Sequence, residues 1–244
     1  MKHCLKAVAA LIAATTAAGM AHAQSAGNSV VGMGWIQLRP VNGGSTPQVM
    51  TSINGVPTNQ EIAGADVIKP GGGGTLAITV EHYFTDNVSI YLLGGRPGSL
   101  KVNGAGNLAG YGAIGKARVI SPQLNVRYHF GPSQERFRPF LGFGLNYTKF
   151  YDEEITNTPY VTAVLGPGGS ATVKASSSWN PVFEAGADYW IDKRWSIGLA
   201  LSYTPASTTF TIDGRTASGT TSVTKSRLDL NPLTAVLALK YSFQ

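Results

Sequence analysis

Few residues of this chain could carry covalent chemistry. The single cysteine, Cys4, lies near the N-terminus, and beyond residue 23 the only histidines are His82 and His129. The glycine-rich runs at 71–74 and 104–106 lack the Gly-Lys-Ser/Thr sequence of a phosphate-binding loop, so we interpret them as mobile loop. No spacing of cysteine and histidine suggests a metal site. The sequence therefore predicts no enzyme, with no catalytic residue, no cofactor and no metal.

Residues 1–23 have the features of a secretory signal peptide. Two lysines give a positive start, an apolar run follows over residues 7–19, and Ala-His-Ala at 21–23 offers the small-x-small cleavage pattern. A transmembrane anchor is the alternative, but the run is shorter than the roughly 20 apolar residues that span a bilayer. We therefore expect cleavage near Ala23 and one domain over residues 24–244.

The composition favours an all-β chain. Thirty glycines and only 13% charged residues suit a protein with many turns. The formal net charge of +6 is not concentrated in any Lys/Arg run, so no nucleic-acid partner is expected. Beyond residue 23 no apolar run is long enough for a membrane-spanning helix. Closed β-barrels are the other structure that pairs every backbone N–H and C=O within hydrocarbon.

Strict alternation of apolar and polar residues is the main structural signal. Over residues 123–130 the sequence reads Gln-Leu-Asn-Val-Arg-Tyr-His-Phe, which places Leu124 and Arg127 on opposite faces of a strand, whereas a helix would place them together. The same period of two recurs in six other segments and more weakly in the first. The other seven predicted strands lie near residues 30–38, 75–81, 88–93, 137–148, 179–189, 195–203 and 233–243.

The connections alternate between short and long. Short turns fall at residues 85–87, 131–136 and 192–194, and long connections at residues 39–74, 96–118, 151–177 and 207–226. This order is typical of an eight-stranded antiparallel up-and-down transmembrane β-barrel, whose short turns face the periplasm together with both termini. Aromatic residues near both strand ends suit interfacial belts. A soluble lipocalin-like barrel is the alternative, because its polar faces could be the solvent side.

The strand phase assigns two groups of side chains to the lumen. One group is charged and lies in the half near the short turns, where buried ions need partners. We predict that it forms a periplasmic plug, with His129 at its lower edge: Glu81, Arg127, Arg138, Glu184, Asp188 and Lys240. The other group is mainly apolar and lies nearer the long connections. It could line a channel or simply fill the barrel: Tyr91, Leu93, Phe140, Val182, Ala200, Ser202, Leu228 and Leu230.

Several segments resemble the OmpW (outer-membrane protein W) family. The most specific is Arg-Pro-Phe-Leu-Gly-Phe-Gly-Leu-Asn-Tyr-Thr-Lys-Phe-Tyr-Asp at 138–152, supported by Phe-Thr-Asp-Asn at 84–87, Ala-Gly-Ala-Asp-Tyr at 185–189 and Leu-Asp-Leu-Asn-Pro at 228–232. The resemblance implies a Gram-negative outer-membrane location, with outer-membrane lipid, lipopolysaccharide and the barrel-assembly machinery as partners. It also implies passage of small hydrophobic molecules through an apolar lumen that exits sideways into the bilayer.

Further details follow from the same resemblance. It places a narrow constriction at Leu93 and Ser202, of which only the leucine is apolar. Prolines remove a donor from a strand ladder, which could loosen a wall for lateral exit. Four are candidates for this effect: Pro139, Pro181, Pro205 and Pro232. Proline also ends strands near bulges, and this is the interpretation that we favour for Pro205.

Three functions from different classes follow. The first is a passive outer-membrane channel or receptor for small hydrophobic molecules. The second is a structural or adhesive barrel whose long loops bind host, phage or bacteriocin partners. The third is a membrane acyltransferase, which would need a histidine near the outer rim, whereas His82 and His129 both lie near the short turns. The acidic run at 152–154 offers calcium ligands, but we expect a solvated loop rim there.

Overall fold

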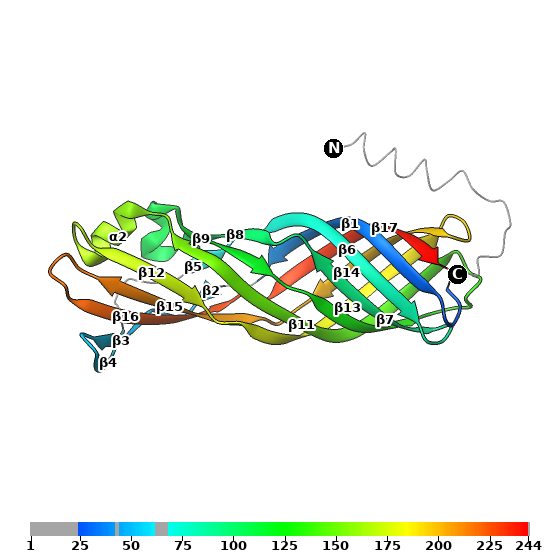
Figure 1. Cartoon of the computed structure of the whole chain (residues 1–244), viewed down its shortest axis with the longest axis horizontal. Coiled ribbons are helices and arrows are strands. Elements are labelled where there is room, and N and C mark those ends of the chain that lie inside the picture. Colours follow the sequence, from blue (N-terminus) through cyan, green and yellow to red (C-terminus); the bar gives the residue numbers. More distant parts are fainter. Residues whose placement is uncertain (1–23, 42–43, 62–67, 244) are drawn as a thin grey trace, which may run out of the picture.

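The structure is a computed structural model that describes residues 24–41, 44–61 and 68–243 (Figure 1). The predicted signal peptide and its cleavage site lie outside these residues. Among the described residues, no helix has the length and apolar character required to cross a membrane.

Eight antiparallel strands close into a barrel, which confirms the predicted fold class. Each strand pairs with the next barrel strand along the chain, and the last strand, β17, pairs with the first, β1. The ring therefore has no open edge. Closure matters because an unpaired strand edge would leave backbone polar groups in hydrocarbon. The barrel strands are β1 (Ser29–Pro40), β6 (Gly73–Tyr83), β7 (Val88–Gly95), β10 (Gln123–His129), β11 (Phe137–Ile155), β13 (Ser178–Trp190), β14 (Trp195–Tyr203) and β17 (Pro232–Phe243).

The two faces of the wall differ in the way that the alternation predicts. Along β14 every second residue is buried and the residues between are exposed. Large apolar side chains dominate the outer face, and Trp35, Phe143 and Leu237 are 50%, 56% and 56% exposed. Such a continuous exposed apolar surface would be unstable in water, and it suits contact with lipid chains.

The long connections differ from the expectation, because most of them are folded as strands. They extend the barrel at the end that lies opposite the C-terminus (Figure 1). We call this end of the barrel the long-loop end and the end near the C-terminus the short-turn end. β5, β8 and β9 continue the barrel sheet from β11, and a six-stranded sheet contains the others. The additional elements are β2 (Gly44–Ser45), β3 (Val49–Ile53), β4 (Val56–Glu61), β5 (Ile68–Pro70), β8 (Gly98–Gly104), η1 (Gly106–Tyr111), β9 (Ala113–Ile120), α2 (Thr158–Leu165), β12 (Ser170–Ala175), β15 (Ser207–Arg215) and β16 (Thr221–Asp229).

The interpretation of the glycine-rich runs as mobile loop is corrected in part, because Gly73 and Gly104 lie in strands, whereas residues 71–72 lie outside the strands. Gly74 lies within β6, and a Cβ atom there would come within 2.6 Å of the Trp35 ring. Gly104 ends β8, and a Cβ atom there would clash with the carbonyl oxygen of Leu108. Glycine is needed at both positions for close packing, which local sequence does not distinguish from loop flexibility.

The acidic run at 152–154 lies on the extension of β11 and faces cations of β9. Glu154 lies 3.0 Å from Lys116 Nζ, and Asp152 lies 3.6 Å from Arg118 Nε. All four side chains are more than half exposed, so each pair contributes little to stability.

We expect that Leu237→Arg destabilises the protein by about 2–4 kcal/mol, because an arginine would then face hydrocarbon near the middle of β17. The control is Val56→Arg in β4, whose side chain is exposed on the extension. Urea unfolding in lipid vesicles measures both. Equal effects of the two substitutions would contradict the assignment of the outer face to lipid.

Candidate functional site

Five ionised side chains meet inside the barrel toward the short-turn end, and we call them the charged floor: Glu81, Arg127, Glu184, Asp188 and Lys240. Each is at most 5% exposed. Arg127 lies 2.8 Å from Glu184 and 3.3 Å from Glu81. Lys240 Nζ lies 2.6 Å from Asp188 and 3.1 Å from Glu81. Glu81 therefore joins the two cations into one connected network.

Small and polar neighbours complete the network. Asn125 donates to Glu184 Oε2 at 2.8 Å, and Ser89 donates to Glu81 Oε1 at 2.7 Å. Gly198 gives Lys240 room to reach Asp188, because a Cβ atom at position 198 would lie within 2.6 Å of both side chains. Sequence reasoning did not assign these residues to the site, although their phase pointed inward.

Arg138 differs from the expectation. It is fully buried and lies opposite Asp188 in the β11–β13 register. Its guanidinium donates to the backbone carbonyl oxygens of Asp86 and Gly131 and to Gln24 Oε1. Arg138 therefore binds the turns and the first described residue at the barrel mouth, whereas the prediction placed it among the acids.

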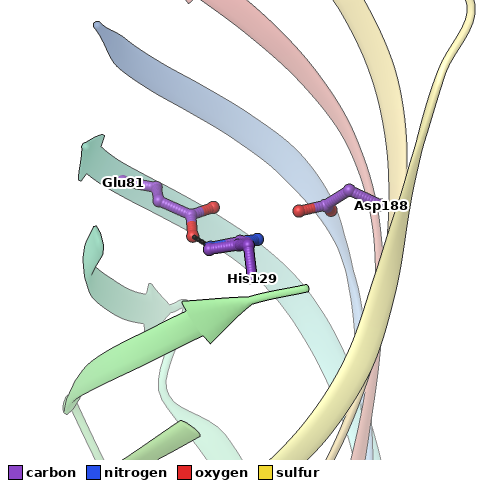
Figure 2. A group of neighbouring side chains, drawn as sticks. All are labelled: Glu81, His129 and Asp188. Carbon is purple, nitrogen blue, oxygen red and sulfur yellow. Dashed lines mark hydrogen bonds and ion pairs between the residues drawn. The ribbon is translucent and has the colours of Figure 1, made fainter. Parts of the chain in front are cut away.

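Glu81, His129 and Asp188 offer oxygen and nitrogen atoms within 4.8 Å of one another, a grouping that could suit a metal ion (Figure 2). His129 Nε2 lies 3.1 Å from Glu81 Oε1. Figure 2 marks this contact with a dashed line. The Lys240 ammonium contacts both carboxylates, so a metal ion there would have to compete with a cation that the protein already supplies. The geometry suits internal charge pairing better than metal binding.

Two aromatic rings pack against the charged floor. The guanidinium carbon of Arg127 lies 3.1 Å from the Tyr91 ring centroid and 4.2 Å from that of Phe140. Such cation–π contacts are strongest where the cation is shielded from water. Both rings belong to a lower apolar cluster of buried residues: Ala77, Tyr91, Leu93, Phe140, Ala200 and Val236.

A second, upper apolar cluster lies toward the long-loop end. Phe150 and Phe210 meet within it at a ring separation of 6.3 Å. Its buried members come from β8, β9, β11, β15 and β16, and from the segments around them: Leu100, Ala117, Phe150, Ala206, Phe210, Leu228 and Leu230. Leu100 and Ala117 belong to a connection that the sequence analysis treated as loop.

A cavity of about 150 Å³ lies between the two clusters, and its surface is mainly apolar. Leu93 and Ile36 border it from the lower side, and Leu100, Phe150 and Leu230 border it from the upper side.

All eight residues assigned to the lumen lining are buried. Leu93 and Leu230 border the cavity, and Leu228 lies in the upper cluster. Three others pack in the lower cluster: Tyr91, Phe140 and Ala200. Val182 and Ser202 face inward from β13 and β14 without bordering the cavity. The cavity thus lies higher in the barrel than the sequence indicated.

The comparisons with known proteins agree with this architecture. The family model described as "OmpW family" matches residues 27–243. Outer membrane protein W of Vibrio cholerae serotype O1 is 31% identical over 169 residues, which are 69% of this chain and 73% of that protein. The dibenzothiophene metabolism operon protein PahQ of Pseudomonas aeruginosa is 25% identical over 118 residues, 48% of this chain and 49% of that protein.

The solved structures include a similar fold. The crystal structure of the outer membrane protein OprG from Pseudomonas aeruginosa matches with a TM-score of 0.76 at 23% identity, covering 92% of this chain and 99% of OprG. The family model spans nearly all of the described residues, and the closed barrel has the apolar outer face that a membrane requires. The chain therefore belongs to the OmpW family of Gram-negative outer-membrane β-barrels.

Proposed function

We propose that this protein is a passive outer-membrane channel or receptor for small hydrophobic molecules. The observation that carries the proposal is the mainly apolar cavity of about 150 Å³ between the two apolar clusters. An engineered protein cavity of about 150 Å³ stays dry and binds benzene, so a single aromatic ring has a suitable size. Binding of this kind needs burial of apolar surface and no chemical step.

The name of one relative points in the same direction. PahQ is named for an operon of dibenzothiophene metabolism, and dibenzothiophene is an apolar aromatic compound. We infer a related class of solute here, at the size of a single ring.

We further propose that the charged floor acts as a plug below the cavity. An eight-stranded lumen is just wide enough to be filled by side chains, and here five paired ions and two aromatic rings occupy its lower part. An apolar molecule would have to break buried ion pairs to pass, which is costly. We therefore expect a solute in the cavity to leave by another route.

The wall beside the cavity offers such a route. The β7–β10 pairing ends at Leu93 and Gln123, and the β8–β9 pairing begins at Gly98 and Val119. Pro97 lies between these ladders and has no N–H to donate. We propose that a solute passes sideways into the bilayer at this interruption.

The four prolines assigned to wall loosening differ in their positions. Pro139 and Pro181 lie within the continuous β11–β13 ladder and face outward. Pro205 is exposed beyond the end of β14. Pro232 borders the cavity and lies opposite Pro40. Of these four prolines, Pro232 is therefore the one that is placed to affect the wall of the cavity.

We expect that Leu93→Asp and Leu228→Asp each reduce uptake of radiolabelled toluene by about tenfold or more, because a carboxylate in this lumen penalises an apolar occupant. Uptake is measured in vesicles that carry lipopolysaccharide in the outer leaflet. Val56→Asp on the exposed extension is the control and should leave uptake unchanged. Unchanged uptake in both lumen variants would contradict the channel and favour a structural or adhesive role for the extension.

We expect that Arg127→Met lowers the free energy of unfolding by about 3–5 kcal/mol, since Glu81 and Glu184 would lose their shared cation while buried. The matched control is Arg118→Met, which removes an exposed partner of Asp152 and should cost less than about 1 kcal/mol. Urea unfolding in lipid vesicles compares the two variants. A loss below 1 kcal/mol for Arg127→Met would show that the floor does not depend on this pairing.

A further inference from the structure

Several polar side chains border the cavity, and three of them lie where β10 begins and β11 passes it. Gln123 and Asn146 lie opposite each other in the β10–β11 register, and both border the cavity together with Thr148. Gln123 is 5% exposed and Asn146 is 4% exposed. These amides therefore lie in the protein interior and are not part of a solvated rim.

The two amides differ in their hydrogen bonds. Asn146 Nδ2 donates to Ser121 Oγ at 2.7 Å and to the carbonyl oxygen of Pro122 at 3.1 Å, and Asn146 Oδ1 accepts from Thr148 at 2.7 Å. The buried Nε2 of Gln123 has no hydrogen-bond partner among the described residues. Among the side chains bordering the cavity, it is the one described residue with such a buried, unpaired nitrogen.

An unpaired buried amide destabilises the protein, whereas a partner that accepts its hydrogen bond offsets that cost. Gln123 lies beside Leu93, and both border the cavity, so a molecule there would meet an apolar surface and an amide donor that has no partner within the described residues. A carboxylate is a poor partner, because an isolated ion loses far more solvation than a neutral oxygen in an apolar site.

We propose that Gln123 is a specificity-determining residue that selects apolar molecules carrying a neutral hydrogen-bond acceptor, such as a carbonyl oxygen, over pure hydrocarbons. This inference rests on the proposed function, because it names the class of molecule that the cavity binds. The ring of the solute lies among Leu93, Phe150 and Leu230, and its oxygen accepts a hydrogen bond from Gln123 Nε2.

The test uses three probes of nearly equal size, which are toluene, benzaldehyde and aniline. Each is equilibrated with the full mature barrel in lipid nanodiscs, and binding is corrected for partition into empty nanodiscs. We expect benzaldehyde to bind about tenfold more tightly than toluene, which corresponds to one net hydrogen bond. Gln123→Met keeps the length of the side chain and should remove this preference. Gln60→Met, on the exposed β4, is the matched control and should retain it.

The outcomes separate the two claims. Equal binding of toluene and benzaldehyde to the unsubstituted protein, or the same preference in Gln123→Met, would overturn the role of Gln123 and leave the channel intact. Tighter binding of aniline than of benzaldehyde would overturn the choice of an acceptor. Binding of none of the probes would overturn the proposed function as well. The carbonyl stretching frequency of bound benzaldehyde gives a second readout, since it should be lower with Gln123 present than in Gln123→Met.

Discussion

The pairing of buried ions around Arg127 is the interaction on which the organisation of the lumen depends. Ions in a narrow protein interior are tolerated only when opposite charges and hydrogen bonds surround them. Glu81 forms ion pairs with both Arg127 and Lys240. Arg127 also pairs with Glu184, and Lys240 also pairs with Asp188, so the five side chains form one network. We propose that this network closes the lumen from below, so that the space above it can keep an apolar lining.

The same strands provide this interior and the lipid-facing surface. In β17 the buried Lys240 and Val236 alternate with the exposed Leu237 and Leu239. A shift of the register by one residue would turn Lys240 toward lipid and Leu239 toward the ions. The charged interior and the apolar exterior therefore specify the same register, and the closed ring of ladders keeps it in place.

The sequence was sufficient to predict the barrel, because a period of two residues can be detected within a short stretch of sequence, before any contact between strands is known. Phase also placed all eight lumen-lining candidates inside, including Leu93 and Leu228. Strand phase could not predict which groups the long side chains would bind. Arg138 lies opposite Asp188 in register, yet its guanidinium reaches the carbonyl oxygens of the turns.

The strands of the extension at the long-loop end were not predicted, and some of them pair with strands that are distant in the sequence. β3 pairs with β16, and β12 pairs with β15. β12 and β16 are rich in small and polar residues and carry few large apolar ones, so their local sequence does not identify these pairings. The upper boundary of the cavity depends on this extension through Leu100, which explains why the cavity lies higher than expected.

We propose that an apolar molecule occupies the cavity above the charged floor. A crystal of the mature protein soaked with bromobenzene tests it directly, because bromine gives an anomalous signal that locates the ring. The account predicts a lumen peak between Leu93 and Leu230, on the side of Tyr91 away from Arg127. Bromine found only on the outer wall, or on the short-turn side of Arg127, would contradict it.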